Sequence, residues 1–220
     1  MRAVRIWDLP TRLFHWLLAA SVVGLIATGQ VGGNAMVWHF RLGHVVLALL
    51  AFRLVWGLVG GRWSRFSSFL YPPRVTLAYL RGDGAVATRP GHSPLGALSV
   101  FALLALLTLQ VASGLLSDDE IAFAGPLTSL VSGATVSQAT RFHKDIGQLV
   151  LIALVALHVA AILFYLWRRK DNLVKPMLLG DKPLAQPVPA SRDDVLSRLL
   201  AVVVFAACSG LAAWVSLLGA

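Results

Sequence analysis

Two histidines lie near opposite ends of one long apolar stretch, residues 142–165, FHKDIGQLVLIALVALHVAAILFY. His143 and His158 are fifteen residues apart, which in an α-helix is a rise of about 22 Å with both imidazoles on one broad face. Such a helix crosses a bilayer, where ionisable side chains are costly and therefore indicate function. An imidazole near each membrane face indicates two stacked redox centres rather than one.

Five apolar runs are long enough to position such groups across a membrane, at about 13–29, 38–60, 95–116, 141–167 and 199–219. A chain with 57% hydrophobic and 13% charged residues is an integral membrane protein rather than a soluble domain. Pro72 and Pro73 predict a short surface helix that ends at Leu80. The single cysteine, Cys208, excludes an internal disulfide, a four-cysteine iron–sulfur site and covalent c-type haem. Any cofactor must be held mainly by histidine.

The basic residues predict the orientation of the chain. The N-terminal tail, the 61–94 connector and the 168–198 segment hold fifteen of the nineteen lysines and arginines, so we expect them on the cytoplasmic side. The N-terminus is then cytoplasmic, and the net charge of +9 reflects topology rather than nucleic-acid binding. A cleaved signal peptide is the alternative for the first run, but His15, Trp16 and the absence of a small-residue cleavage site favour a retained helix.

Four of the six histidines match in depth under this topology. His15 and His158 lie toward the inner side, and His39 and His143 lie toward the outer side. Two such pairs are what bis-imidazole ligation of two b-type haems requires, each ring binding iron through one nitrogen. The alternative for any single histidine is an inert position at the water interface.

The remaining histidines leave a choice open. His44 follows His39 by five residues, or about 140° around a helix, so the two cannot face one ring, and periodicity does not choose between them. His92 precedes the third span and is interpreted as interfacial, with contact to a haem propionate as the alternative.

Glycine and arginine are candidates for contacts with a flat, anionic cofactor. Gly43 and Gly147 each follow a histidine by four residues, where a missing side chain lets a macrocycle approach, although small residues also serve helix packing. Four arginines are candidate partners of propionates, or alternatively interface anchors: Arg12, Arg41, Arg53 and Arg141.

These stretches together resemble the bacterial cytochrome b561 family, which includes the cytochrome b subunits of nickel–iron hydrogenases. The resemblance covers nearly all of residues 4–183. It rests on VRIWDLPTRLFHW, on H-x-x-x-G followed by AFRLVWGLVGGRWSRF, and on GHSPLGALSVFALLALL, ALHVAAILFY and DNLVKPMLLGDKP.

The resemblance implies which residues bind the haems. The family's second-helix ligand precedes a glycine by four residues, which matches His39 and Gly43 and favours His39 over His44. The other ligands match His15, His143 and His158. The two fourth-helix histidines of the family are usually fourteen apart rather than fifteen, so we expect a π-bulge or a small rotation to absorb one residue. The expected cofactor-binding residues are His15, His39, His143, His158, Gly43 and Arg53.

The expected fold is all-α, a four-helix transmembrane bundle that holds two haems b, plus a C-terminal fifth transmembrane helix. Residues 1–183 are the cytochrome b561-type domain, and residues 184–220 are a linker and the additional helix. We expect a multi-pass protein of the bacterial inner membrane, with the lipid bilayer around it.

The expected function is electron transfer in a respiratory chain, between a periplasmic redox protein (a c-type cytochrome, a hydrogenase or similar) and the quinone pool. This is an electron-transfer subunit rather than a stand-alone oxidoreductase, since six-coordinate irons have no open site. One alternative is a superoxide oxidase that reduces quinone, although Asp118, Asp119 and Glu120 suit a basic protein partner better than an anion. A second alternative is a haem-free transporter or assembly factor.

Overall fold

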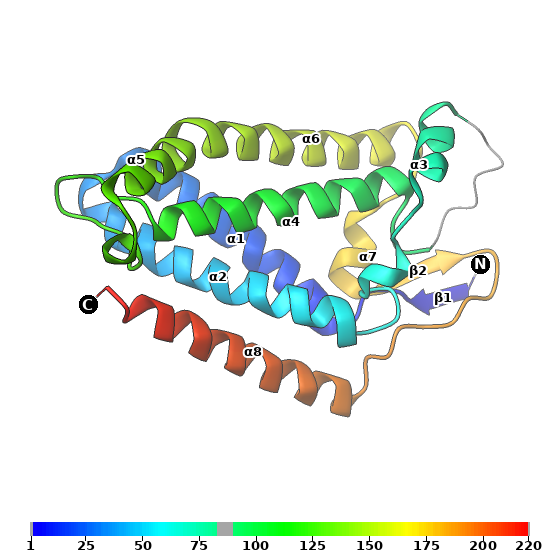
Figure 1. The fold of residues 1–220 in the computed structure, drawn as a ribbon. Coiled ribbons are helices and arrows are strands. Elements are labelled where there is room, and N and C mark those ends of the chain that lie inside the picture. The colour runs from blue at the N-terminus through cyan, green and yellow to red at the C-terminus, as the bar shows by residue number, and fades with distance from the viewer. Residues whose placement is uncertain (1, 83–89, 220) are drawn as a thin grey trace. The chain divides into compact units, whose positions relative to one another are not determined.

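In the part of the chain that the structure describes, the fold is all-α apart from one pair of short strands, and five helices are long and apolar enough to span a membrane (Figure 1). The computed structural model describes residues 2–82 and 90–219, so residues 83–89 of the 61–94 connector lie outside the described part. The five helical spans are Leu9–Val31, Gly33–Val59, Pro94–Leu115, Gly133–Trp167 and Val195–Ser216. The five predicted apolar spans are confirmed as helices long enough to cross a membrane.

The helices of these spans are α1 (Leu9–Val31), α2 (Met36–Val59), α4 (Pro94–Leu115), α6 (Gln148–Trp167) and α8 (Val195–Ser216). The predicted surface helix is α3, with the expected bounds Pro73–Leu80. Three short 3-10 turns complete the helical elements: Gly33–Ala35, Phe66–Ser68 and Thr128–Leu130.

The fourth span contains three consecutive segments. A polar helix, α5 (Gly133–Arg141), comes first, and Ser132 caps its N-terminus by accepting the backbone N–H of Thr135. A π-helical segment, Phe142–Gly147, follows and leads directly into α6. A π-turn contains one residue more than an α-turn. The structure therefore has its extra residue beside His143, as the fifteen-residue spacing to His158 predicts.

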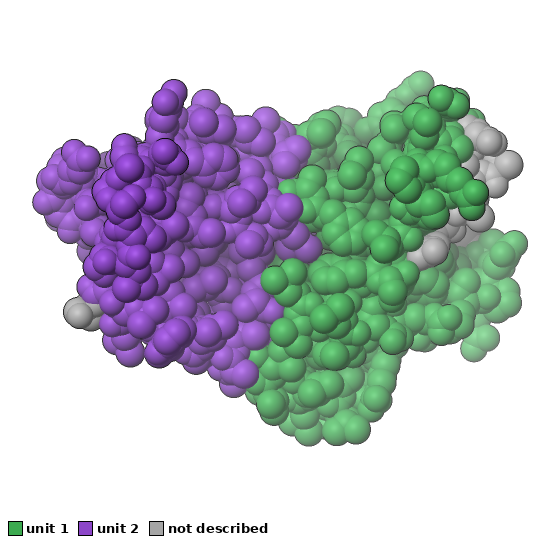
Figure 2. All heavy atoms as spheres, in the orientation of Figure 1, with its two compact units in different colours: residues 1–14, 53–102, 156–204 green, residues 15–52, 103–155, 205–220 purple. Residues whose placement is uncertain are grey.

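The chain divides into two compact units (Figure 2), and the long helices contribute residues to both. Unit 1 consists of residues 1–14, 53–102 and 156–204. Unit 2 consists of residues 15–52, 103–155 and 205–220.

Unit 1 contains the two strands, which the sequence did not predict. β1 (Arg2–Arg5) pairs antiparallel with β2 (Asp181–Leu184), and the Arg5 guanidinium binds the Asp181 carboxylate at 2.7 Å. The helix α7 (Val174–Leu179) precedes β2. Val4, Ile6 and Trp7 form the buried cluster of this unit. Four partly buried side chains pack against it: Trp63, Met177, Leu184 and Val188.

The carboxylate of Asp8 is fully buried in unit 1 and joins the start of α1 to the segment that follows α2. Its Oδ1 accepts the Thr11 N–H at 2.8 Å, which is an N-cap and explains why α1 begins before the predicted residue 13. Its Oδ2 accepts the Ser64 hydroxyl at 2.7 Å and the Gly61 N–H at 3.1 Å, just beyond α2.

Unit 2 contains a four-helix core. Side chains from α1, α2, α4 and α6 form one buried cluster: Val22, Val46, Leu50, Leu107 and Leu151. The fifth helix, α8, contacts α2 through Phe205, whose ring lies 5.9 Å from that of Phe52. Membrane helices pack through such dispersion contacts, since lipid is as apolar as the side chains.

Candidate functional site

Two histidines that are far apart in sequence lie together in unit 2. His39 belongs to the first turn of α2, and His143 belongs to the π-helical segment. Their ring centroids are 6.0 Å apart, and the ring planes are nearly perpendicular at 85°. The structure thus brings together the two histidines predicted to form the outer pair.

Both rings are held through Nδ1 by a backbone carbonyl of a neighbouring helix. His39 Nδ1 donates to the carbonyl of Leu25 on α1 at 3.0 Å, and His143 Nδ1 donates to that of Gln110 on α4 at 2.9 Å. A ring that donates through Nδ1 keeps its lone pair on Nε2, the form in which neutral imidazole binds a metal. Both side chains are thus in the ligand tautomer.

The separation of these rings fits ligation of one metal ion between them. Two metal–nitrogen bonds of about 2 Å, plus about 1 Å from each nitrogen to its ring centroid, place two trans imidazoles about 6 Å apart. The observed 6.0 Å agrees. Within residues 2–82 and 90–219, no group of three or more His, Cys, Asp or Glu side chains is arranged for a metal ion, so this donor set is a pair, as haem ligation requires.

Glycines make room for both rings. A Cβ on Gly114 of α4 would come within 2.8 Å of the His143 ring, and one on Gly29 of α1 within 3.3 Å of the His39 ring. A Cβ on Gly43 would meet no atom within 4 Å, so open space adjoins α2 there, as predicted for macrocycle approach. Gly147 differs, because a Cβ there would overlap the side chain of Gln110.

An apolar cavity surrounds the pair, and His44 lines it as well. His44 Nδ1 donates to the Phe40 carbonyl of its own helix at 2.8 Å, and its buried Nε2 has no hydrogen-bond partner among the described residues. The ring that lies beside that of His143 is nevertheless the ring of His39. Its hydrogen bond to the Leu25 carbonyl of α1 holds it there.

The predicted inner pair has one histidine in each unit. His15 belongs to unit 2, where its ring packs edge-on against Trp16 at 5.0 Å, and His158 is a half-buried residue of unit 1. Pairing of these two histidines stays a prediction.

Arg53 is a buried cation in unit 1. Its side chain is 4% exposed, and its guanidinium lies 4.6 Å from the Phe66 ring and 5.9 Å from the Phe14 ring. Its Nη1 has no hydrogen-bond partner within the described residues. Burying a charged donor unpaired is expensive, so this atom fits an anionic group such as a carboxylate.

His92, the other basic side chain weighed for propionate contact, packs into an aromatic cluster of unit 1. Its ring lies 4.4 Å from that of Phe69 and 4.7 Å from that of Trp7. This packing agrees with the interfacial interpretation.

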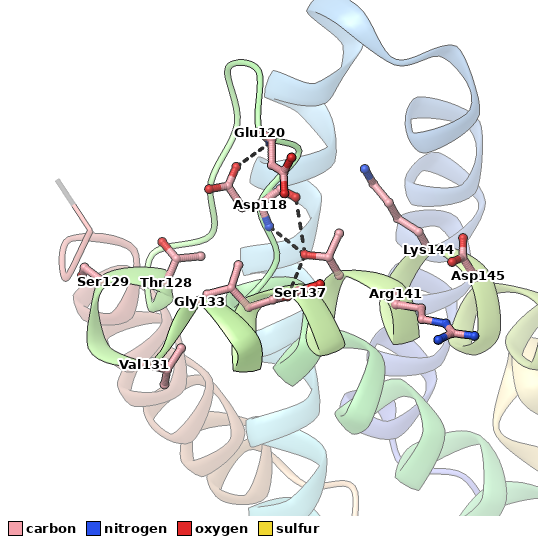
Figure 3. Close-up of a pocket in the computed structure, with 12 residues that line it drawn as sticks. Asp118, Glu120, Thr128, Ser129, Val131, Gly133, Ser137, Arg141, Lys144 and Asp145 are labelled. Atoms are coloured by element: carbon pink, nitrogen blue, oxygen red, sulfur yellow. Dashed lines mark hydrogen bonds between the residues drawn. The ribbon is translucent and has the colours of Figure 1, made fainter.

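The loop after α4 and the helix α5 form a second, polar cavity of about 690 Å³ (Figure 3). Three carboxylates and two cations line it: Asp118, Glu120, Asp145, Arg141 and Lys144. Asp118 and Lys144 line the histidine cavity too, so the polar cavity adjoins the pair. Asp119 organises the loop by accepting three backbone N–H groups, which lower the pKa of its carboxyl.

Sequence reasoning missed the residues that support the histidines. Gln110 is a lone amide within an apolar span, and a polar group there signals a specific partner. Asp8 directly before Leu-Pro is an N-cap signal. Gly29 and Gly114 had no local signal, since only the packing of another helix makes them necessary.

Comparison with known proteins shows the family of the chain. Residues 6–180 match the family model described as "Prokaryotic cytochrome b561". The chain is 23% identical to a protein of Cupriavidus necator (82% of this chain, 87% of that one) and 23% identical to one of Rhodobacter capsulatus (82% and 81%). A third relative, from Azotobacter chroococcum, is 25% identical (81% and 85%). All three are named "Probable Ni/Fe-hydrogenase B-type cytochrome subunit", and no solved structure matches the chain.

The match covers most of the chain, including all four histidines of the predicted pairs. A b-type cytochrome carries haem b, which fits a site built from neutral histidines in an apolar cavity. With its five apolar spans, the chain belongs to the prokaryotic cytochrome b561 family of multi-pass membrane proteins.

Proposed function

We propose that this protein carries electrons across the bacterial inner membrane through two haems b, between a hydrogenase or another redox protein outside and quinone. The observation that carries the proposal is the His39–His143 pair, two ligand-form rings 6.0 Å apart. Haem supplies one-electron chemistry by cycling between ferric and ferrous iron. The chain supplies the ligands, their orientation and an apolar enclosure.

The outer haem is assigned to His39 and His143, with Gly43 as the open face of its cavity. The inner haem is assigned to His15 and His158. Arg53 is assigned to a propionate, because its buried Nη1 needs an anionic partner. With two histidines assigned to each haem, neither iron would keep a free site for substrate, which supports electron transfer over substrate chemistry.

The external partner is proposed from two observations. Relatives that the chain matches over more than 80% of its length are named as hydrogenase subunits. The polar cavity beside the outer pair offers Asp118, Glu120 and Asp145 to a partner's basic residues. Charged rims of this kind steer encounter and make its rate dependent on ionic strength.

The inner side is proposed as cytoplasmic from the distribution of lysine and arginine. Electrons would leave the inner haem for quinone on that side. Reaction of the reduced protein with a soluble quinone tests this step, and a reduced haem that quinone does not oxidise contradicts it.

Haem content tests the assignment directly. The purified protein should bind two equivalents of haem b, and His39→Ala and His158→Ala should each leave one. Thr108→Val, an exposed change on α4, is the control and should leave two. A parent protein with one haem or none refutes the proposal.

Superoxide oxidation is the competing function for the same haems. Stopped-flow mixing of oxidised protein with superoxide distinguishes the two, because rapid haem reduction favours the oxidase. The three carboxylates of the polar cavity oppose an anionic substrate, so we expect slow reduction.

A further inference from the structure

Gln110 and His143 are joined by two hydrogen bonds that run in opposite directions. The His143 ring donates from Nδ1 to the backbone carbonyl of Gln110 at 2.9 Å. The Gln110 side chain donates from Nε2 to the backbone carbonyl of His143 at 2.8 Å. One residue of α4 thus contacts both the ring and the backbone of this histidine.

The bond from the Gln110 amide reaches a carbonyl within the π-helical segment. Hydrogen bonding in a π-turn reaches one residue further than in an α-turn, which changes how the carbonyls of the segment are paired. An under-bonded carbonyl in an apolar environment costs free energy, and side chains commonly supply the missing donor. The Gln110 amide donates to a carbonyl of this segment, that of the residue that carries the ring.

The hydrogen bond to His143 fixes which way the Gln110 amide points. Gln110 Oε1 is buried without a hydrogen-bond partner among the described residues, and it lies where a Cβ on Gly147 would be. Rotating the amide by 180° would turn Oε1 toward the carbonyl of His143. The hydrogen bond that Nε2 donates to this carbonyl would then be lost. The hydrogen-bond network therefore selects one orientation.

We propose that Gln110 is a positioning residue that sets the orientation of the His143 ring at the outer haem. This rests on the proposed function, in which His143 is a ligand. The amide holds the π-turn against α4, and the carbonyl of the same residue holds the ring nearly perpendicular to that of His39. Outer hydrogen bonds of this kind set ring orientation and raise ligand basicity.

Gln110→Leu removes the amide and keeps the size of the side chain. The electron paramagnetic resonance anisotropy of a ferric bis-imidazole haem depends on the angle between the ring planes, so it reports orientation directly. We expect both haems to bind and the g-anisotropy of one haem to fall. Its midpoint potential should rise, because without the amide the π-turn moves and the Nδ1–H bond of His143 to the retained Gln110 carbonyl weakens, which lowers the basicity of the ligand. The signal and the potential of the other haem should not change.

Gly147→Ala is a second variant, on a different helical segment, that displaces the amide without removing it. It should give the same spectral change, and it should add less in a Gln110→Ala background, where the overlap with the amide is gone and only the close contacts of the new methyl with Phe142 remain. Thr108→Val is the control on α4, because its hydroxyl bonds only within that helix, to Leu104.

Loss of one haem in Gln110→Leu also overturns the proposal, because it would show that Gln110 is needed for haem binding rather than for ring orientation. Unchanged spectra and potentials in both variants, or loss of both haems in Gln110→Leu, overturn the proposal. A parent protein without the outer haem refutes the proposed function as well. A parent with both haems and unaffected variants refutes the role of Gln110 alone.

Discussion

Replacing Asp8 by asparagine tests the buried hydrogen-bond network that connects the start of α1 to the end of α2. Both carboxylate oxygens of this fully buried side chain are used. Oδ1 accepts from Thr11 N and from Trp56 Nε1, and Oδ2 accepts from Gly61 N and from the Ser64 hydroxyl. An asparagine amide has one accepting oxygen, so its NH₂ group must face donors.

The magnitude follows from which bonds can be replaced. The Ser64 hydroxyl can rotate, but the Gly61 N–H at 3.1 Å cannot find another acceptor. A hydrogen bond to a charged group contributes about 1.5–3 kcal/mol, and an unsatisfied buried donor costs about 1–3 kcal/mol. Asp8→Asn should therefore lower the free energy of unfolding by about 3 kcal/mol, which for a chain of this size is about 10 °C in Tm.

Thermal unfolding of the purified protein in one fixed detergent measures this, followed by tryptophan fluorescence. Asp171→Asn is the matched control in the same unit, because its half-exposed carboxylate makes one ion pair, to Lys182 at 3.4 Å. Such a surface pair contributes about 0.2–1 kcal/mol. Equal melting temperatures for the two variants would show that the Asp8 network adds no stability.

Other changes should follow the packing around the outer pair and the loop beside it. Gly114→Ala should reduce outer-haem content more than Gly29→Ala, since its Cβ would be 2.8 Å rather than 3.3 Å from a histidine ring, and pyridine haemochrome assay ranks the two. Gly43→Ala should bind haem normally whereas Gly43→Leu, which fills the open face, should lose one equivalent; equal content in both would remove Gly43 from the site. The Asp119 pKa is lowered by backbone N–H groups, so its contribution to loop stability is complete above the unfolded pKa of about 4 and is lost as the pH falls through the lower folded pKa. The backbone amides of residues 121–123 should therefore exchange their hydrogens faster in that acid range. Between pH 5 and 7 their exchange rates, once corrected for the intrinsic effect of pH on amide exchange, should not change.

The long helices were predictable because twenty apolar residues have few alternatives in a membrane protein. The residues at which the helices begin and end were harder to predict, because they depend on capping hydrogen bonds. α1 begins at Leu9 because Asp8 accepts the Thr11 N–H, four residues before the apolar run suggests. The strands were missed because each has four residues and its partner is almost the whole chain away, so no local pattern marks them.

The choice between His39 and His44 shows what a single sequence lacks. Both histidines are on α2, and both donate Nδ1–H to a backbone carbonyl. For His44 the acceptor is Phe40 of its own helix, a contact that any helix provides. For His39 the acceptor is Leu25 of α1, a contact that exists only once the helices have packed. Spacing in the sequence cannot distinguish the two, and here the resemblance to the family favoured the histidine that the structure places beside His143.

The fifteen-residue spacing is the clearest case in which a sequence irregularity located a structural one. An extra residue between His143 and His158 had to be absorbed somewhere, and the π-helical segment lies at the first of them. Its position brings the His143 backbone to Gln110, a residue that spacing could not select. The π-turn is therefore part of the construction of the ligand site. A protein whose task is electron transfer benefits from such rigidity, because a ligand ring fixed in tautomer and angle before haem binds need not reorganise when the iron changes charge.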